Sequence, residues 1–434
     1  MRKFLCISPY FVPMNYVGAK RALHACRHLP DHGWEAAVVA LPADMERDAN
    51  LEALVPPVPL LRTLRGGPVA WAEDARDRLR GGPASGWSAQ YKAQAREKRV
   101  PGRVERLLDE ARGAFAAMDR FTKYLPWALP GVLRFARAQR VELVYANAGP
   151  FSALLLADAV RRALGVPMVL DLRDPWSLEP NYRASWTATG LKAVEAIEER
   201  LFRDAARVIL NTESAHAAHV RHYLGAIPAE RFTFLRNQFD PDLYGPPGPA
   251  PTAGDPFRII YYGHLRPTKN AGLFLGALKR LIDERGLRPG QLEFTTLGEV
   301  TPADQATWES LGLAPYIRQH GWLSFPDSPS LLGTADVLLD LMGPNHGLQI
   351  SGKIYDYLAA GRPILSVSPN RELDAVFAQT GAGERVDLDE DAIVAALARR
   401  LDRGSFTPNP KGLQAFTAAA FGEALGAIFD EARP

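Results

Sequence analysis

Short apolar runs alternate along the chain with longer segments whose apolar positions recur every three or four residues. Such runs predict buried strands where they end at glycine or polar residues, and the three-to-four spacing predicts amphipathic helices. In the first half the expected strands are Phe4–Ser8, Ala36–Leu41, Val141–Ala146, Met168–Leu170 and Ala205–Asn211. In the second half they are Phe257–Gly263, Leu292–Leu297, Ile317–Gly321, Ala335–Asp340 and Ile364–Val367. Strands that alternate with helices predict an α/β protein with parallel sheets.

The length of 434 residues predicts two domains, because a single core rarely grows to this size. A stretch rich in proline and glycine, 241–256, is expected to be the linker between them. We therefore predict a first domain at 1–240 and a second at 257–410, followed by an amphipathic helix within 411–434. Residues 42–140 interrupt the first domain as an irregular and mainly helical insertion.

The charge of the chain is unevenly distributed, although the net charge is only +2. Residues 60–140 contain 17 Lys and Arg but only 8 Asp and Glu, together with several aromatic residues. A basic and aromatic face suits a membrane surface or an anionic acceptor, and the alternative is a solvated helical insertion with internal ion pairs. No nucleic-acid reader motif accompanies the charge, so we expect no nucleic-acid partner. The early apolar run is interrupted by Pro9 and Pro13, too soon for a signal peptide or a membrane span.

The two cysteines, Cys6 and Cys26, are too few for a disulfide framework, which favours a reducing cytoplasm. We expect no bound metal and no cofactor.

One segment, Ser351–Pro363, concentrates the candidate chemistry. Its apolar positions predict a short helix that Gly361 ends, and the strand from Ile364 follows at once. The helix begins where a parallel sheet would bind ligands, and its free N–H groups favour phosphate. Lys353 and Asp356 are three residues apart, so the helix presents a cation and a carboxylate on one side.

This segment resembles the donor-site helix of GT-B glycosyltransferases, especially the retaining family four. In that family a carboxylate five residues before the glycine binds the ribose of a nucleotide-sugar, and Asp356 stands at this position. Many relatives have a Glu eight residues earlier, where this chain has Leu348. The fold that the resemblance implies is GT-B, with two Rossmann-like domains whose parallel sheets face across a cleft. The last helix of such proteins commonly crosses back to the first domain.

The resemblance also implies a donor site in the second domain. Relatives have an Arg and a Lys after the first strand of this domain to neutralise the diphosphate; Lys269 matches the Lys, whereas His264 replaces the Arg and Arg266 is the nearby substitute. A glycine-rich loop before the helix has backbone N–H groups suited to phosphate. The expected donor-binding residues are Gly263, His264, Arg266, Lys269, Gly343, Asn345, His346, Gly347, Ser351, Gly352, Lys353 and Asp356.

In the first domain, polar residues follow the carboxyl ends of the expected strands, where an open α/β sheet binds its ligands. The run Asp171–Trp176 resembles one that faces the acceptor in a bacterial branch of the family. Its charges could orient an acceptor hydroxyl, bind a cationic acceptor or form a salt-bridged loop. The expected acceptor-binding residues are Gly18, Lys20, Asn147, Asp171, Arg173 and Asp174, and the expected catalytic residues are Asp174, Asp171 and Lys269.

Together these features predict a metal-independent glycosyltransferase that transfers a sugar from a nucleoside-diphosphate-sugar to a glycan, lipid-linked or small-molecule acceptor. Family resemblance implies retention of anomeric configuration; an inverting enzyme would use Asp171 or Asp174 as its base. The expected context is bacterial glycan or natural-product biosynthesis in the cytoplasm, with peripheral contact to the inner membrane face through residues 60–140. The alternatives are a nucleotide-sugar epimerase of the same fold, a non-catalytic sugar-nucleotide-binding subunit, and a membrane-anchoring scaffold.

Overall fold

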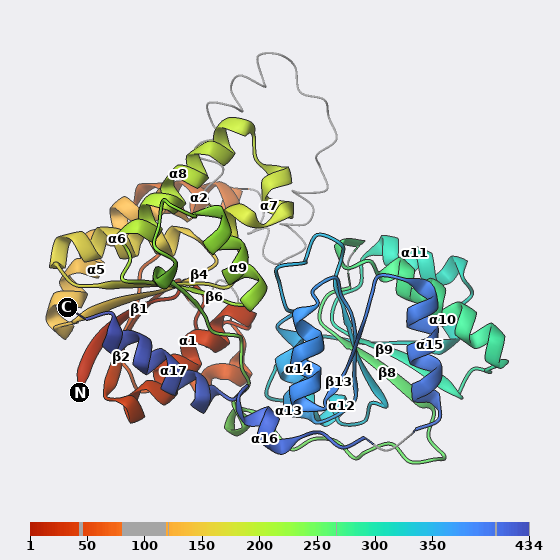
Figure 1. Ribbon diagram of the computed structural model, residues 1–434. Coiled ribbons are helices and arrows are strands. Elements are labelled where there is room, and N and C mark those ends of the chain that lie inside the picture. The colour runs from red at the N-terminus through yellow and green to blue at the C-terminus, as the bar shows by residue number, and fades with distance from the viewer. Residues whose placement is uncertain (43–46, 80–118, 120, 266, 404–405, 434) are drawn as a thin grey trace. The chain divides into compact units, whose positions relative to one another are not determined.

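The structure, a computed structural model, describes residues 1–434 except 43–46, 80–118, 120, 266, 404–405 and 434 (Figure 1). It divides into two compact units. The first comprises Met1–Asn211, Ala215–Leu235 and Phe421–Pro434, and the second comprises Thr212–Ser214 and Arg236–Ala420.

The first unit contains a seven-stranded sheet in the order β3-β2-β1-β4-β5-β6-β7, in which every pair of neighbours is parallel. Its strands are β1 Arg2–Ile7, β2 Trp34–Ala40, β3 Leu60–Arg62, β4 Leu143–Ala148, β5 Met168–Leu172, β6 Arg207–Leu210 and β7 Phe232–Phe234. Its principal helices are α1 Val17–His28, α2 Gly67–Leu79, α5 Leu125–Gln139, α6 Ser152–Leu164, α7 Pro180–Ser185 and α8 Ala188–Asp204, and the short helix α9 spans Glu213–His222.

The second unit contains a six-stranded parallel sheet in the order β10-β9-β8-β11-β12-β13. Its strands are β8 Phe257–Tyr262, β9 Leu292–Leu297, β10 Ile317–His320, β11 Val337–Leu341, β12 Ile364–Val367 and β13 Gly383–Val386. Its helices are α10 Ala271–Arg285, α11 Pro302–Ser310, α12 Ser328–Leu332, α13 Lys353–Ala360, α14 Glu372–Thr380, α15 Glu390–Leu401 and α16 Pro410–Gln414. The predicted α/β class with parallel sheets is therefore confirmed.

Strand alternation explains why helices cover both faces of the second sheet. On β8, Ile259 and Tyr261 join one apolar core with α10 and α15, while Ile260 and Tyr262 join a second core with α13 and α14. Successive side chains of a strand point to opposite faces, so a fully apolar strand needs cover on each.

The last helix, α17 (Ala418–Glu431), packs on the first sheet from Phe421 onward. The ring of Phe429 lies 5.1 Å from that of Phe4 and 5.3 Å from that of Trp34 between centroids, both edge-on. Close approach to α1 depends on Gly422, because a Cβ there would come within 2.6 Å of the His28 Cβ. The carboxyl-terminal helix is thus part of the first unit's core.

The insertion differs from the expectation in one respect. We expected 42–140 to be irregular and helical, but Leu60–Arg62 forms β3 and extends the sheet beside β2. The described remainder includes α2 and α5, and the central part of the expected insertion lies outside the described residues.

Candidate functional site

In the second unit, two glycines shape the carboxyl edge of the sheet. Gly263 follows β8 with φ +114°, and Gly298 follows β9 with φ +138°, a region that only glycine adopts readily. A Cβ on Gly298 would lie 2.7 Å from the Gly263 carbonyl oxygen, and one on Gly263 would lie 3.0 Å from Lys353 Cε. Gly263, which we expected to bind donor, therefore also makes room for the Lys353 side chain.

Helix α13 starts at Lys353 and ends at Gly361, which has the expected left-handed conformation with φ +64°. The predicted helix is confirmed. Lys353 Nζ lies 3.9 Å from Asp340 Oδ1 and 4.9 Å from the centroid of the Tyr261 ring. Asp340 is fully buried at the end of β11, and its other oxygen accepts a 2.8 Å hydrogen bond from Ser366. Sequence reasoning missed Asp340, although an acid that ends an apolar strand was a usable signal.

Asp356 lies in the first turn of α13 and is 5% exposed. The Tyr244 hydroxyl donates a hydrogen bond to its Oδ1. Burial raises the pKa of Tyr244 well above its usual value and the Asp356 carboxylate raises it further, so the hydroxyl stays protonated and able to donate. Lys353 and Asp356 thus have different protein partners, although both start from the same helical turn.

Loops after β8 and β10 contribute an aromatic surface. The His264 ring stacks on Trp322, with centroids 5.1 Å apart and planes 12° apart. Trp322 is 46% exposed, which is unusual for so large an apolar side chain. His264, which replaces the Arg of relatives and which we expected to bind donor, therefore stacks on an aromatic side chain here.

Lys269 ends the short helix Pro267–Lys269, and its Nζ lies 3.4 Å from Met342 Sδ. The glycine-rich loop approaches this helix closely, since a Cβ on Gly343 would lie 2.2 Å from the Thr268 carbonyl oxygen. Within the loop the His346 N–H donates to the Gly343 carbonyl at 3.1 Å. The structure therefore brings Lys269 close to the loop that contains Asn345 and Gly347.

Of the remaining donor candidates, Ser351 and Gly352 directly precede α13, and Ser351 Oγ lies 3.4 Å from Lys353 Nζ. Arg266 lies outside the described residues.

In the first unit, Asp171 ends up in the core and not at a surface. Its side chain has no exposed area, and Arg21 Nε donates a 2.7 Å hydrogen bond to its Oδ2. The Tyr145 hydroxyl donates to the same oxygen. Burial raises the pKa of Tyr145 well above its usual value, and the Asp171 carboxylate adds to the rise. In this arrangement Asp171 neutralises a buried arginine, and no part of its side chain is exposed to an acceptor.

Arg173 is held by backbone carbonyl groups, with its Nε 2.9 Å from the Ala148 oxygen and its Nη2 donating to Gly149. A Cβ on Gly18 would lie 2.3 Å from Arg173 Nη1. Gly18 therefore leaves space for a protein side chain, where we expected it to leave space for a ligand. Asn147 is 2% exposed and donates hydrogen bonds to Ser8 and to the Gly18 carbonyl.

Asp174, by contrast, is half-buried and follows β5 at the carboxyl edge. The Tyr182 hydroxyl, from α7, donates to its Oδ2 at 3.4 Å. The Asp174 carboxylate and burial raise the pKa of Tyr182 well above its usual value, so Tyr182 stays a donor. Lys20, also half-buried, lies near the start of α1.

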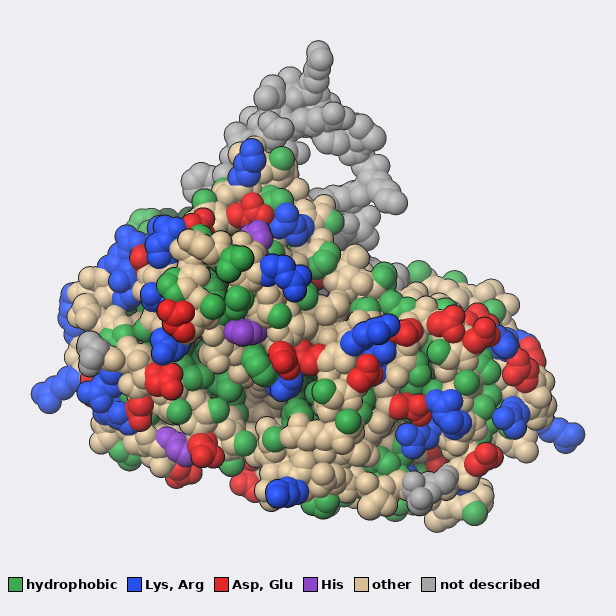
Figure 2. All heavy atoms as spheres, in the orientation of Figure 1, with side chains coloured by type: hydrophobic (Ala, Val, Ile, Leu, Met, Phe, Trp, Pro, Cys, Tyr) green, Lys and Arg blue, Asp and Glu red, His purple; other side chains and the backbone are tan. Residues whose placement is uncertain are grey.

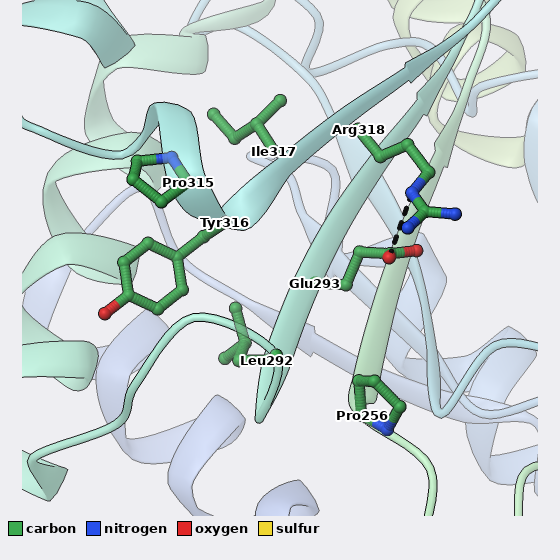
Figure 3. Close-up of a pocket in the computed structure, with 8 residues that line it drawn as sticks. Pro256, Leu292, Glu293, Pro315, Tyr316, Ile317 and Arg318 are labelled. Carbon is green, nitrogen blue, oxygen red and sulfur yellow. Dashed lines mark ion pairs between the residues drawn. The ribbon is translucent and has the colours of Figure 1, made fainter.

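A pocket of about 150 Å³ in the second unit lies elsewhere (Figure 3). It is bordered by Pro256, Leu292 and Ile317, which precede or begin β8, β9 and β10. Arg318 Nε and Glu293 Oε2 form an ion pair there at 3.1 Å. Parallel sheets bind ligands at the carboxyl ends of their strands, so this amino-end pocket is not our candidate site.

Two features are absent from the described part of the chain. No group of three or more His, Cys, Asp or Glu residues there could hold a metal ion. No helix there has both the length and the apolar character needed to cross a membrane.

Comparison with solved structures shows the fold. Sucrose-phosphate synthase from Thermosynechococcus elongatus matches with a TM-score of 0.67 and 13% identity, covering 99% of both chains. HepE of Anabaena, solved in complex with UDP-glucose, matches with a TM-score of 0.59 and 16% identity over 99% of this chain and 100% of HepE. A putative UDP-N-acetylglucosamine 2-epimerase from Listeria monocytogenes has a TM-score of 0.52 and 13% identity, covering 99% of this chain and 97% of its own.

Residues 87–243 match the family model Glycosyltransferase Family 4. The chain has the GT-B fold, which these solved structures share over nearly its whole length. The resemblance inferred from the donor-site helix is thereby confirmed, although the family match lies mainly in the first unit. No curated protein matches this chain.

Proposed function

We propose that this glycosyltransferase transfers a sugar, with retention of configuration, from a nucleoside-diphosphate-sugar bound by the second unit to an acceptor hydroxyl bound by the first. The observation that carries the proposal is the first turn of α13, which brings Lys353 and Asp356 to the carboxyl edge of the second sheet. HepE, which shares the fold, is described in complex with UDP-glucose. A nucleotide at the corresponding edge would meet a helix amino terminus and lysine side chains, which favour phosphate.

The chemistry we propose is electrostatic. Lys269 and Lys353 stabilise the negative charge that grows on the departing diphosphate, and the amino terminus of α13 adds its dipole. Breaking the bond between the anomeric carbon and the diphosphate oxygen leaves an oxocarbenium-like centre, which the acceptor hydroxyl attacks while its proton passes to the departing diphosphate. The proposal needs no metal and no cofactor besides the donor substrate.

For the acceptor we propose Asp174 as the contact residue, because Asp171 is buried against Arg21. Asp174 stays at the carboxyl edge, where its carboxylate can accept a hydrogen bond from an acceptor hydroxyl. Should the enzyme invert configuration, Asp174 is the base. Glycan, lipid-linked and small-molecule acceptors all fit this chemistry, and we place the reaction in the cytoplasm, at the inner membrane face for a lipid-linked acceptor.

The donor proposal predicts nucleotide-dependent stabilisation. We expect uridine, thymidine, guanosine or adenosine diphosphate, or one of their common sugars, to raise the melting temperature by several degrees, because a ligand that binds only the folded state stabilises it. Asp356→Ala should abolish the shift, since the ribose loses its carboxylate partner. Tyr244→Phe is the matched control, because it removes a hydrogen bond from Asp356 but leaves the carboxylate. Equal nucleotide shifts in the parent and Asp356→Ala would contradict the ribose assignment.

We also propose that the nucleobase stacks on Trp322, whose indole is open to solvent at the same edge. Stacking on an aromatic side chain is worth about 1–3 kcal/mol per base, so Trp322→Ala should raise the Kd for the preferred nucleotide by roughly 5- to 150-fold. Trp322→Phe should retain most of the affinity. Trp71→Ala, which removes another exposed tryptophan from the first unit, is the control. Titration calorimetry measures all four proteins, and a change below twofold in Trp322→Ala would refute the stacking.

A nucleotide-sugar epimerase is the second candidate, supported by the fold it shares with the Listeria protein. An epimerase would convert the donor in the absence of any acceptor. A non-catalytic subunit would bind nucleotide and produce neither product. Chromatography of the donor after incubation with and without acceptors separates the three functions.

A further inference from the structure

Helix α5 has one face in the core and another exposed. Ala128, Val132 and Ala136 recur every four residues and are buried. On the opposite side Trp127, Pro130, Arg134 and Arg137 are exposed. Their spacing of three and four residues places them on a single stripe of the helix. A helix that exposes a tryptophan and two arginines on one stripe presents an amphipathic surface to its surroundings.

A second exposed tryptophan lies beside this stripe. Trp127 is 53% exposed and packs over the start of α2, where a Cβ on Gly67 would lie 2.4 Å from its ring. Trp71 follows Gly67 by four residues, so it lies on the same side of α2, and it is 70% exposed. Exposed tryptophans are costly in water, and two neighbouring ones indicate a contact surface.

The two acids of α2 whose side chains the structure describes, Glu73 and Asp74, are already paired with other residues. Glu73 on α2 accepts hydrogen bonds from Lys123 and Tyr124, and Asp74 accepts one from Arg65. Burial by itself would raise the pKa of Glu73, but the hydrogen bonds from Lys123 and Tyr124 outweigh it, and the pKa lies below its usual value. This acid therefore stays charged and paired.

The exposed arginines of this surface differ from these acids in their contacts. Within the described part of the chain, the side chains of Arg134, Arg137 and Arg140 have no acidic partner at ion-pair distance and no hydrogen-bonding partner. Figure 2 shows Lys and Arg side chains gathered over the end of the first unit where Figure 1 draws α5 and α6.

We propose that this surface, formed by Trp71, Trp127, Arg134, Arg137 and Arg140, docks the protein on an anionic lipid bilayer. Tryptophan side chains prefer the interface between water and hydrocarbon, and arginines beside them pair with lipid phosphates. Charge complementarity favours an anionic leaflet over a zwitterionic one. A soluble polyanion would use the arginines but would leave both indoles in water. The inference adds an interaction surface to the proposed glycosyltransferase and does not depend on sugar transfer.

The test is co-sedimentation of the full chain with two kinds of vesicle. One is pure phosphatidylcholine, and the other contains about 30% of the anionic lipid phosphatidylglycerol. We expect binding only to the anionic vesicles and weaker binding at high salt, because screening reduces the attraction. Arg134→Glu/Arg137→Glu should weaken binding by at least about tenfold, and Trp71→Ala/Trp127→Ala should weaken it at both salt concentrations. Both arginines are exposed, so the arginine variant should keep the parent melting temperature. Trp127 also packs on α2, so vesicle binding of the tryptophan variant is compared at a temperature where its own melting curve shows it folded.

The matched control is Arg285→Glu/Arg288→Glu, which makes the same change of charge on exposed residues of the second unit. Its binding should stay within about twofold of the parent, since lipid contacts are local. Three results would overturn the proposal: no binding of the parent to anionic vesicles, equal losses in the control and the arginine variant, or binding to heparin that exceeds binding to vesicles. Nucleotide thermal shifts, measured on the same variants, separate this result from the proposed function. A variant that loses vesicle binding but keeps the nucleotide-dependent rise in melting temperature has lost only this surface. Absence of that rise in every protein, the parent included, would contradict only the proposed donor site.

Discussion

Replacing Arg21 with methionine is expected to lower the free energy of unfolding of the first unit by about 3–5 kcal/mol. The substitution keeps much of the side-chain volume but leaves the Asp171 carboxylate buried without its cation. Both partners are almost completely inaccessible, with 1% and 0% of their side chains exposed. Arg21 also donates to the Leu235 carbonyl at 2.9 Å, and its guanidinium lies over the ring of Phe421 on the last helix. The variant therefore removes three contacts within the first unit at once, those with the Asp171 carboxylate, the Leu235 carbonyl and the Phe421 ring.

Guanidinium denaturation measures the effect, and two companion variants make it specific. Arg21→Met/Asp171→Asn should recover part of the loss, because no unpaired charge remains in the core. Arg162→Ala removes an arginine that is 54% exposed and pairs with Asp158, so it should cost less than about 1 kcal/mol. A loss in Arg21→Met no larger than that of Arg162→Ala would show that the buried pair does not stabilise the unit.

This pair also shows why the sequence predicted the position of Asp171 but not its role. Its location directly after a buried strand is a local property, and the carboxyl edge was inferred correctly. Its burial depends on Arg21, which is 150 residues away along the chain and reaches it from another element. No spacing rule connects residues so far apart, so an acid at a strand end was taken for a ligand contact.

The donor half shows the same limit. Helix α13 and its glycine stop follow from apolar spacing, and the structure has them where they were expected. The partners of its charged residues, Asp340 and Tyr244, come from the preceding strand and from the linker. The stack of His264 on Trp322 likewise joins two loops that only the parallel sheet brings together. Local pattern therefore predicted which elements present the site, and tertiary packing decided which side chains are available.

The edge strand β3 was missed for a different reason. Leu60–Arg62 is only three residues long and is half-buried throughout, so it shows no alternation of apolar and polar positions. It becomes a strand because β2 offers an open edge to pair with.

Replacing Lys269 with methionine is expected to slow sugar transfer by about 10²–10³-fold while leaving the fold intact. The ammonium group lies 3.4 Å from the Met342 thioether, which is a weak acceptor, so a diphosphate oxygen would be a much stronger partner. The charge on that oxygen grows as the glycosidic bond breaks. An ammonium at this position therefore stabilises the transition state more than the bound donor, and its loss should lower kcat more than it raises KM.

Lys269 tests this electrostatic mechanism better than Lys353 does. Removing Lys353 would also leave Asp340 buried without a cation, so a slower reaction could come from a damaged sheet edge. Lys279→Met is the control, because Lys279 is on the following helix, α10, and pairs only with Asp283 among the described residues at the surface. The rate of nucleoside diphosphate release, measured with the donor that the thermal-shift screen identifies, gives kcat and KM for both variants. A Lys269→Met rate within twofold of the parent would show that the leaving group is stabilised elsewhere, and the mechanism would then have to rest on Lys353 and the amino terminus of α13.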